Sequence, residues 1–242
     1  MIEKAAREAD AESLQSIIEE NEEVNFPKKE LNRALLGAVS SCISIKKNEV
    51  IDCITALLDA GANVDAEDPT DGKTALMIAC EKGYIEVVDH LINNDAQVDL
   101  KDRKQRSPLL YAIEAQGENA DVVIKLLKKQ ADVNGASIDG WTPLLKSTNK
   151  QYHEILKHLL SHGASPHHRL LLTQTTALHI ACEHGDITSV QKLMPYGAEL
   201  DAQNRERETP LSIAQRNAHK GGQYEQLYSY LKSIWDEKEL KA

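Results

Sequence analysis

The chain has 242 residues, a formal net charge of −10 and an aromatic content of only 4%. The negative charge disfavours nucleic acid and anionic membranes as partners, because both repel an acidic surface. No apolar run reaches the roughly 18 residues of a membrane span, and the charged N-terminus lacks the apolar part of a signal peptide. We therefore expect a soluble protein of the cytoplasm, with the nucleus as the alternative compartment.

Four cysteines would indicate a metal site or a disulfide framework only at suitable spacings. Cys42, Cys53, Cys80 and Cys182 form no CxxC pair and no other metal-ligand pattern. Disulfide frameworks are typical of small secreted domains rather than of a chain of this length. We expect reduced cysteines and no cofactor.

The first predicted helices precede the regular part of the sequence. Ala11 to Glu20 places Leu14, Ile17 and Ile18 on one face, so these side chains should point inward. Another helix begins near Leu31.

From residue 74 onward a short motif, Ser or Thr followed two residues later by Leu, recurs at spacings of 33, 35, 34 and 33 residues. The motif begins at Thr74, Ser107, Thr142, Thr176 and Thr209. In three cases Pro follows the Ser or Thr directly, which is typical of an N-cap and the first helical position. The chain is therefore built of repeats, each opened by a capped helix.

Each repeat continues with a second helix and a stop. The predicted second helices are Glu49–Gly61, Glu86–Asp95, Asp121–Gln130, Glu154–Gly163 and Thr188–Gly197. Three of them end at glycine, which readily adopts the left-handed conformation of a helix stop. Asp95 and Gln130 take the place of that glycine, at a cost of about 1 kcal/mol each if they become left-handed. Pro195 should end its helix early.

The last repeat is predicted to close with a longer helix, Gln223–Glu237. Its apolar face comprises Tyr224, Leu227, Leu231 and Ile234.

This order of β-turn, helix and helix resembles the ankyrin repeat family, whose T-P-L-H-x-A and G-A-D-V-N signatures are similar to TTALHIA from Thr175 and ADVN from Ala131. The resemblance implies an all-α ankyrin-repeat solenoid of stacked helix-turn-helix units with short β-turn or hairpin fingers. It covers nearly the whole chain, which we expect to be a single domain over residues 1–242. The seven expected units are 1–27 (N-terminal cap), 28–67, 68–101, 102–136, 137–170, 171–203 and 204–242 (C-terminal cap).

The first two units depart from the regular pattern. Ile2, Ala5, Ala6, Arg7 and Asp10 match the family's terminal repeat, with Ala9 in place of glycine. In the second unit about eight residues are inserted around residues 41–48. We expect the insertion in the loop between the helices or in a longer first helix.

The resemblance also implies where a partner binds. In a solenoid the turns and first helices line a concave side, and the family's variable contact positions lie in the turn and just before the glycine between the helices. The residues at those positions are Lys73, Glu81, Arg103, Lys104, Arg106, Glu114, Ile138, Asp139, Trp141, Asn149, Leu172, Thr173, Thr175, Glu183, His184, Arg205, Glu206 and Glu208. We expect a protein–protein interaction module that binds a protein or peptide there, as an adaptor, scaffold or substrate-recruiting unit. We expect it to be monomeric alone and to have no small-molecule substrate.

Three features of these turns suggest the centre of the binding surface. Trp141 is a large amphipathic side chain, and Trp is enriched in binding hot spots; packing against a neighbouring turn is its alternative role. Leu170, Leu171 and Leu172 form either an exposed interface or a tucked turn. The basic turn, residues 101–106, either contacts an anion or is simply solvated.

Chemistry-bearing motifs are scarce. Histidines gather at His153, His158, His162, His167 and His168, and two of them lie four residues apart, as in some zinc sites. The segment is nevertheless not HExxH, and no phosphate loop or nucleophile motif is present. We expect no enzyme, no catalytic residues and no metal ligands. The alternatives are a metal-binding or catalytic protein using His153–His168, or a structural spacer of a larger protein.

Overall fold

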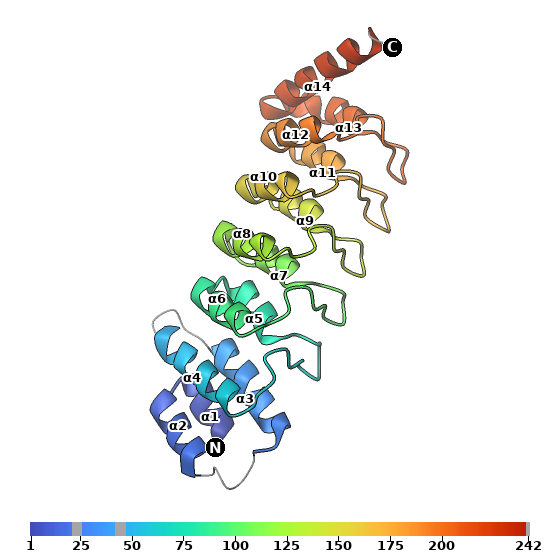
Figure 1. The fold of residues 1–242 in the computed structure, drawn as a ribbon. Helices are drawn as coiled ribbons and strands as arrows, with labels where there is room; N and C mark the ends of the chain where they lie inside the picture. Colours follow the sequence, from blue (N-terminus) through green and yellow to red (C-terminus); the bar gives the residue numbers. More distant parts are fainter. Residues whose placement is uncertain (21–25, 42–46, 241–242) are drawn as a thin grey trace. The chain divides into compact units, whose positions relative to one another are not determined.

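The structure, a computed structural model, describes residues 1–20, 26–41 and 47–240 (Figure 1). Over those ranges it contains fourteen α-helices, two short 3-10 helices and no strand. The all-α prediction is confirmed. The chain forms two compact units, Met1–Ala131 and Asp132–Ala242, and the division falls just after the last helix of the predicted fourth repeat.

The first unit contains four helix pairs. Their bounds are α1 (Ile2–Glu8), α2 (Ala11–Glu20), α3 (Lys28–Ser41), α4 (Lys47–Asp59), α5 (Ala75–Lys82), α6 (Ile85–Asn93), α7 (Pro108–Glu114) and α8 (Ala120–Lys128). The first helices of successive pairs contact one another, as do the second helices. This arrangement buries the apolar stripe of each helix against the next pair.

The second unit repeats the arrangement with three pairs. Their bounds are α9 (Pro143–Asn149), α10 (His153–Ser161), α11 (Ala177–His184), α12 (Ile187–Leu193), η2 (Met194–Tyr196), α13 (Pro210–Asn217), η3 (Ala218–Lys220) and α14 (Gln223–Glu239). Leu178, Ile155 and Leu227 are among the fully buried side chains that join the pairs.

Each predicted N-cap is confirmed. The side-chain oxygens of Thr74, Ser107, Thr142, Thr176 and Thr209 each accept a hydrogen bond from the backbone N–H three residues on. Such a cap satisfies one of the free N–H groups of the first turn. The recurring Ser or Thr therefore fixes where each first helix begins.

The predicted exceptions at the helix ends are also confirmed. Asp95 and Gln130 adopt left-handed conformations, with φ of 63° and 62°. Ala9 does the same at the end of α1, with φ of 53°. Pro195 follows the end of α12 at Leu193, and the chain continues as the short 3-10 helix η2.

The first two repeats agree with the sequence prediction only in part. Leu14 is fully buried as expected, but Ile17 and Ile18 are only half-buried. Helix α3 has 14 residues, whereas most first helices have seven or eight. Only Ser41, the first residue of the predicted insertion, belongs to α3, and α4 begins within the insertion at Lys47. Residues 42–46, with Cys42, lie outside the described part of the chain.

Between helix pairs the chain forms short projecting turns, here called fingers. They comprise residues 68–73, 102–106, 137–141, 170–175 and 204–208. In each finger the N–H of the first residue donates to the carbonyl of the last, at N···O distances of 2.8–3.0 Å. The predicted turns are present without strands. Within each unit the odd-numbered helices from α5 onward lie nearer to the fingers than their even-numbered partners (Figure 1).

Candidate functional site

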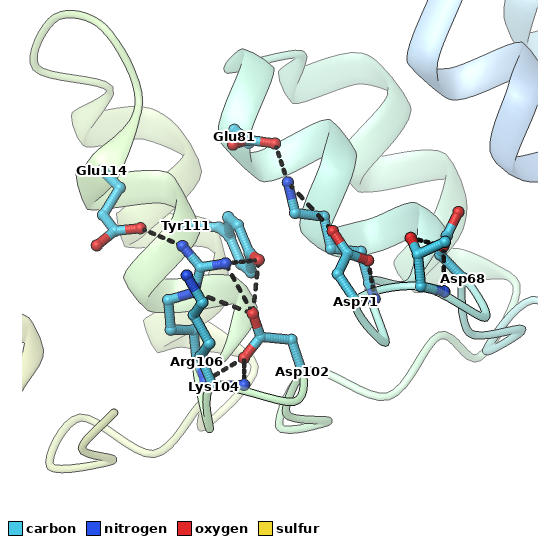
Figure 2. Close-up of polar contacts among 10 residues, drawn as sticks. Asp68, Asp71, Glu81, Asp102, Lys104, Arg106, Tyr111 and Glu114 are labelled. Atoms are coloured by element: carbon cyan, nitrogen blue, oxygen red, sulfur yellow. Dashed lines mark hydrogen bonds and ion pairs between the residues drawn. The ribbon is translucent and has the colours of Figure 1, made fainter. Parts of the chain in front are cut away.

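Asp102 is a buried residue of finger 102–106, and its carboxylate is the acceptor of several hydrogen bonds. Its carboxylate accepts hydrogen bonds from the backbone N–H groups of Lys104 (2.9 Å) and Arg106 (2.7 Å), as Figure 2 shows. It also accepts from the Arg106 Nε (2.9 Å) and from the Tyr111 hydroxyl (2.8 Å). Burial alone would raise the pKa of Asp102, but these hydrogen bonds outweigh it and hold that pKa below its ordinary value.

Arg106 is therefore engaged within the chain. Besides Asp102 it contacts Glu114, with 3.1 Å between Nη1 and Oε2, and its guanidinium carbon lies 4.5 Å from the centre of the Tyr111 ring. The Lys73 ammonium lies 5.0 Å from the centre of the same ring and 3.0 Å from the Glu81 carboxylate. The structure thus brings together four of the predicted binding residues as two ion pairs, Lys73–Glu81 and Arg106–Glu114, whose basic members both contact the Tyr111 ring.

The rest of the basic turn is at the surface. Arg103 and Lys104 are exposed at the tip of the finger. The backbone N–H of Arg103 donates to the carbonyl of Asp71 (3.0 Å), and its guanidinium donates to the carbonyl of Pro69. These bonds tie finger 102–106 to finger 68–73, while Lys104 offers its charge to solvent.

The second unit contains a hollow of about 450 Å³ between its fingers and its first helices, a size within the usual range of ligand sites. Ten of the predicted binding residues line it: Trp141, Asn149, Leu172, Thr173, Thr175, Glu183, His184, Arg205, Glu206 and Glu208. Leu170, His179, Ile180, Asn204, Ile213 and Arg216 complete the lining. Ten of the twelve predicted positions in this unit therefore share one concavity, and Ile138 and Asp139 are outside its lining.

The Arg216 guanidinium on α13 pairs with two carboxylates that line the hollow. The Arg216 Nη2 lies 3.1 Å from the Glu183 Oε2, and the Arg216 Nε lies 3.1 Å from the Glu208 Oε1. Sequence reasoning missed Arg216, although its spacing gave a signal. Arg216 follows Glu183 by 33 residues, so opposite charges occupy the same position of neighbouring repeats.

Trp141 ends finger 137–141 and is half-buried at the edge of the hollow. Its backbone N–H donates to the Ser137 hydroxyl (3.2 Å), which fixes the turn. The Lys146 ammonium lies 4.7 Å from the centre of the indole ring, within range of a cation–π interaction. One part of the ring is thus packed within the chain, and another part faces solvent.

Apolar side chains project from the neighbouring fingers. Ile138, Leu171 and Leu172 are 60%, 61% and 71% exposed. Fingers 137–141 and 170–175 approach each other closely at Gly140. A Cβ atom added to this glycine would lie only 2.9 Å from the backbone nitrogen of Leu171. Of the two sequence alternatives for the leucine turn, exposure applies to Leu171 and Leu172, whereas Leu170 is half-buried. Asp139 is exposed beside Ile138.

The repeat pattern seen in these fingers and helices also appears in comparisons with known proteins. A family model for ankyrin repeats, three copies long, matches residues 2–136, 97–169, 116–204 and 149–225. The chain belongs to the ankyrin repeat family. Ankyrin repeats are protein-interaction modules, so the family indicates interaction with another protein.

Several curated relatives share these ankyrin repeats at modest identity. Neurogenic locus notch homolog protein 1 of Danio rerio is 28% identical over 162 residues, covering 67% of this chain and 7% of the relative. B-cell lymphoma 3 protein homolog of Mus musculus is 28% identical over 166 residues, covering 67% and 37%. SH3 and multiple ankyrin repeat domains protein 2 of Homo sapiens is 27% identical over 188 residues, covering 72% and 9%. The chain thus spans well under half the length of each.

The ankyrin signature histidine, His179, is buried beneath the hollow. Its Nδ1 accepts from the Thr176 backbone N–H (3.2 Å), so the ring proton must reside on Nε2, which donates to the carbonyl of Glu208 (3.1 Å). Burial lowers the pKa of His179. The neutral ring joins α11 to finger 204–208 and so supports the floor of the hollow.

This arrangement makes stability dependent on pH. Because folding lowers the pKa of His179, its neutral form stabilises the fold above the ordinary value of about 6.5, and that contribution is lost as the pH falls below it. We expect the free energy of unfolding to fall between about pH 7.5 and about pH 5.5, by at most about 1.4 kcal/mol per pH unit from this group. Urea unfolding at both values measures it. His179→Gln should show a smaller change; an equal change would contradict the assignment.

The histidines of the sequence cluster from His153 to His168 do not gather at one site. His153 pairs with Asp186 (2.9 Å), His162 lies 2.8 Å from the carbonyl of His158, and His167 lies 3.3 Å from Glu199. His168 is exposed. Among the described residues, no group of three or more His, Cys, Asp or Glu side chains is placed to hold a metal ion.

The cysteines in the described part of the chain are buried. Burial raises the pKa of Cys80 and of Cys182, which keeps both thiols protonated and disfavours them as nucleophiles. Cys53 is also buried. Across residues 1–20, 26–41 and 47–240, no helix has the length and apolar character to cross a membrane.

Proposed function

We propose that the chain binds a segment of a partner protein in the hollow of the second unit, and thereby acts as an adaptor, scaffold or substrate-recruiting module. The observation that carries the proposal is the lining of this hollow. Trp141 and Leu172 place apolar surface at its edge, while Glu183, Glu208 and Arg216 place charge at the ends of the first helices. An apolar anchor surrounded by polar groups is the usual composition of a protein-binding site.

A protein segment fits the hollow better than other classes of ligand. The net charge of −10 disfavours nucleic acid, whose phosphates require a basic surface. From Leu172 at the edge of the hollow, the exposed side chain of Leu171 continues the apolar surface outside it, where a small molecule would not cover it. A partner segment can occupy the hollow and cover this edge together.

Trp141→Ala tests the proposal. Removing a hot-spot indole is expected to cost at least about 2 kcal/mol of binding free energy, which is about thirtyfold in affinity. The measurement is quantitative affinity capture from source-cell extract, followed by titration of the captured partner against both proteins. Thermal unfolding of the variant separates lost binding from lost folding.

Lys157→Ala is the matched control, because Lys157 is exposed on α10 and outside the lining of the hollow. It should capture the same partner as the unmodified chain. A folded Trp141→Ala protein that binds the partner equally well would refute the proposal and favour a structural spacer. Stoichiometric zinc in the purified protein, lost in His158→Ala, would favour the metal-dependent alternative.

A further inference from the structure

Carboxylates outnumber guanidinium groups in the lining of the hollow. Three carboxylates line it, Glu183, Glu206 and Glu208, against two guanidinium groups, Arg205 and Arg216. A single cation, Arg216, serves two of the carboxylates and contacts one oxygen of each. The second oxygens of Glu183 and Glu208 therefore remain able to accept from a further donor.

The second guanidinium is held by the backbone instead. The Arg205 Nη1 donates to the carbonyl of Leu172 (3.1 Å), and the Arg205 N–H donates to the carbonyl of Thr173 (2.8 Å). These bonds tie finger 204–208 to finger 170–175. Glu206 is exposed at the turn of its finger, where its backbone N–H is bonded to Asn204 (2.9 Å). Its carboxylate adds negative charge at the edge of the hollow.

Apolar surface lies next to this negative charge. Leu172 precedes Thr173 on the same finger and is largely exposed, and Trp141 is half-buried at the edge. Below them Ile180 and Ile213 belong to the lining and are almost fully buried, which gives the hollow an apolar floor. The hollow thus offers an apolar contact and a carboxylate-rich contact within a volume of about 450 Å³.

We infer that the bound segment carries a lysine or arginine adjacent to a large apolar residue. This inference rests on the proposed function and specifies the chemistry of the partner. The apolar side chain packs against Trp141 and Leu172, and the basic side chain pairs with Glu183, Glu206 and Glu208. Charge complementarity of this kind selects among partners and speeds association, and the chain's net charge of −10 acts in the same direction.

The test uses an array of short synthetic peptides that samples all residue types at each position. The unmodified chain should select peptides in which Lys or Arg neighbours Leu, Phe or Trp, and their binding should weaken with added salt. Each selected peptide is resynthesised with glutamine in place of the basic residue. These matched peptides should bind about three- to tenfold more weakly, since the charge pairs are partly exposed.

Variants of the chain assign the effect to the carboxylates. Glu206→Gln is the cleaner variant, because Glu183 and Glu208 also hold Arg216. It should lower the affinity for the basic peptides about threefold and leave the affinity for their glutamine analogues unchanged. The double variant Glu183→Gln, Glu208→Gln should lower the affinity for the basic peptides further. Glu225→Gln, exposed on α14 away from the hollow, is the control and should change neither.

The outcomes separate the inference from the proposed function. Selection of acidic or uncharged apolar peptides that depend on Trp141 would overturn the inference and leave the proposed function standing. Basic peptides whose binding is unchanged in both Glu206→Gln and the double variant Glu183→Gln, Glu208→Gln would also overturn it. If no peptide binds, or if Trp141→Ala selects the same peptides as the unmodified chain, the proposed function fails and the inference fails with it.

Discussion

Asp102→Ala is expected to lower the free energy of unfolding by about 3–5 kcal/mol, the range measured when one member of a buried ion pair is removed. Asp102 is 2% exposed and is the common acceptor of two backbone N–H groups, the Arg106 guanidinium and the Tyr111 hydroxyl. Alanine provides no acceptor for any of them. The buried Tyr111 hydroxyl retains Arg106 as a contact but loses the oxygen to which it donates.

The loss should be local before it is global. Repeat units depend mainly on their neighbours, so finger 102–106 and the start of α7 should lose protection from hydrogen exchange before the rest of the first unit. Urea unfolding followed by circular dichroism gives the total change in stability. Hydrogen exchange read by mass spectrometry gives its location.

Two matched variants make the prediction specific. Glu67→Ala removes an exposed carboxylate from the same unit and should change stability by less than about 0.5 kcal/mol. Asp102→Asn keeps the shape and one acceptor oxygen, so its cost should fall between the two. Equal stability of Asp102→Ala and Glu67→Ala would show that the network around Tyr111 does not stabilise the first unit.

Much of the fold could be predicted from the sequence because its determinants are local. A Thr or Ser at the N-cap acts on an N–H three residues away, and a left-handed helix stop depends on the residue that occupies it. The five N-caps, the positive φ of Asp95 and Gln130, and the break at Pro195 all have this local origin. Spacings of 33–35 residues then extended one repeat to the others.

The candidate site was harder to predict because it depends on which charges pair. Arg106 and Lys104 look alike in a basic turn, yet Arg106 is held by Asp102 and Glu114 while Lys104 is exposed. Asp102 stands four residues before Arg106, but only the folded finger directs both toward Tyr111 (Figure 2). For Trp141, the sequence left packing against a neighbouring turn and binding as alternatives; in the structure its half-buried ring lies next to the Lys146 ammonium of the same repeat.

A second large effect is expected at Asp186, where Asp186→Ala should cost about 2–4 kcal/mol. Its Oδ1 accepts from the Ser189 N–H (3.1 Å) as the N-cap of α12, and its Oδ2 accepts from the buried Ser189 hydroxyl. Losing the cap costs about 1 kcal/mol, and an unsatisfied buried hydroxyl costs about 1–3 kcal/mol more. Burial alone would raise the pKa of Asp186, but the contacts with Ser189 and His153 outweigh it and lower that pKa, so the carboxylate is charged at neutral pH.

His153→Ala separates the two roles of this carboxylate. It removes only the contact from α10, with 2.9 Å between the His153 Nε2 and the Asp186 Oδ2, and leaves the cap and the Ser189 hydroxyl satisfied. Because His153 is 36% exposed, we expect a loss of less than about 1 kcal/mol. Urea unfolding ranks the two variants, and hydrogen exchange should show α12 opening in Asp186→Ala alone. Equal losses would place the stabilisation in the contact between repeats rather than in the cap of α12.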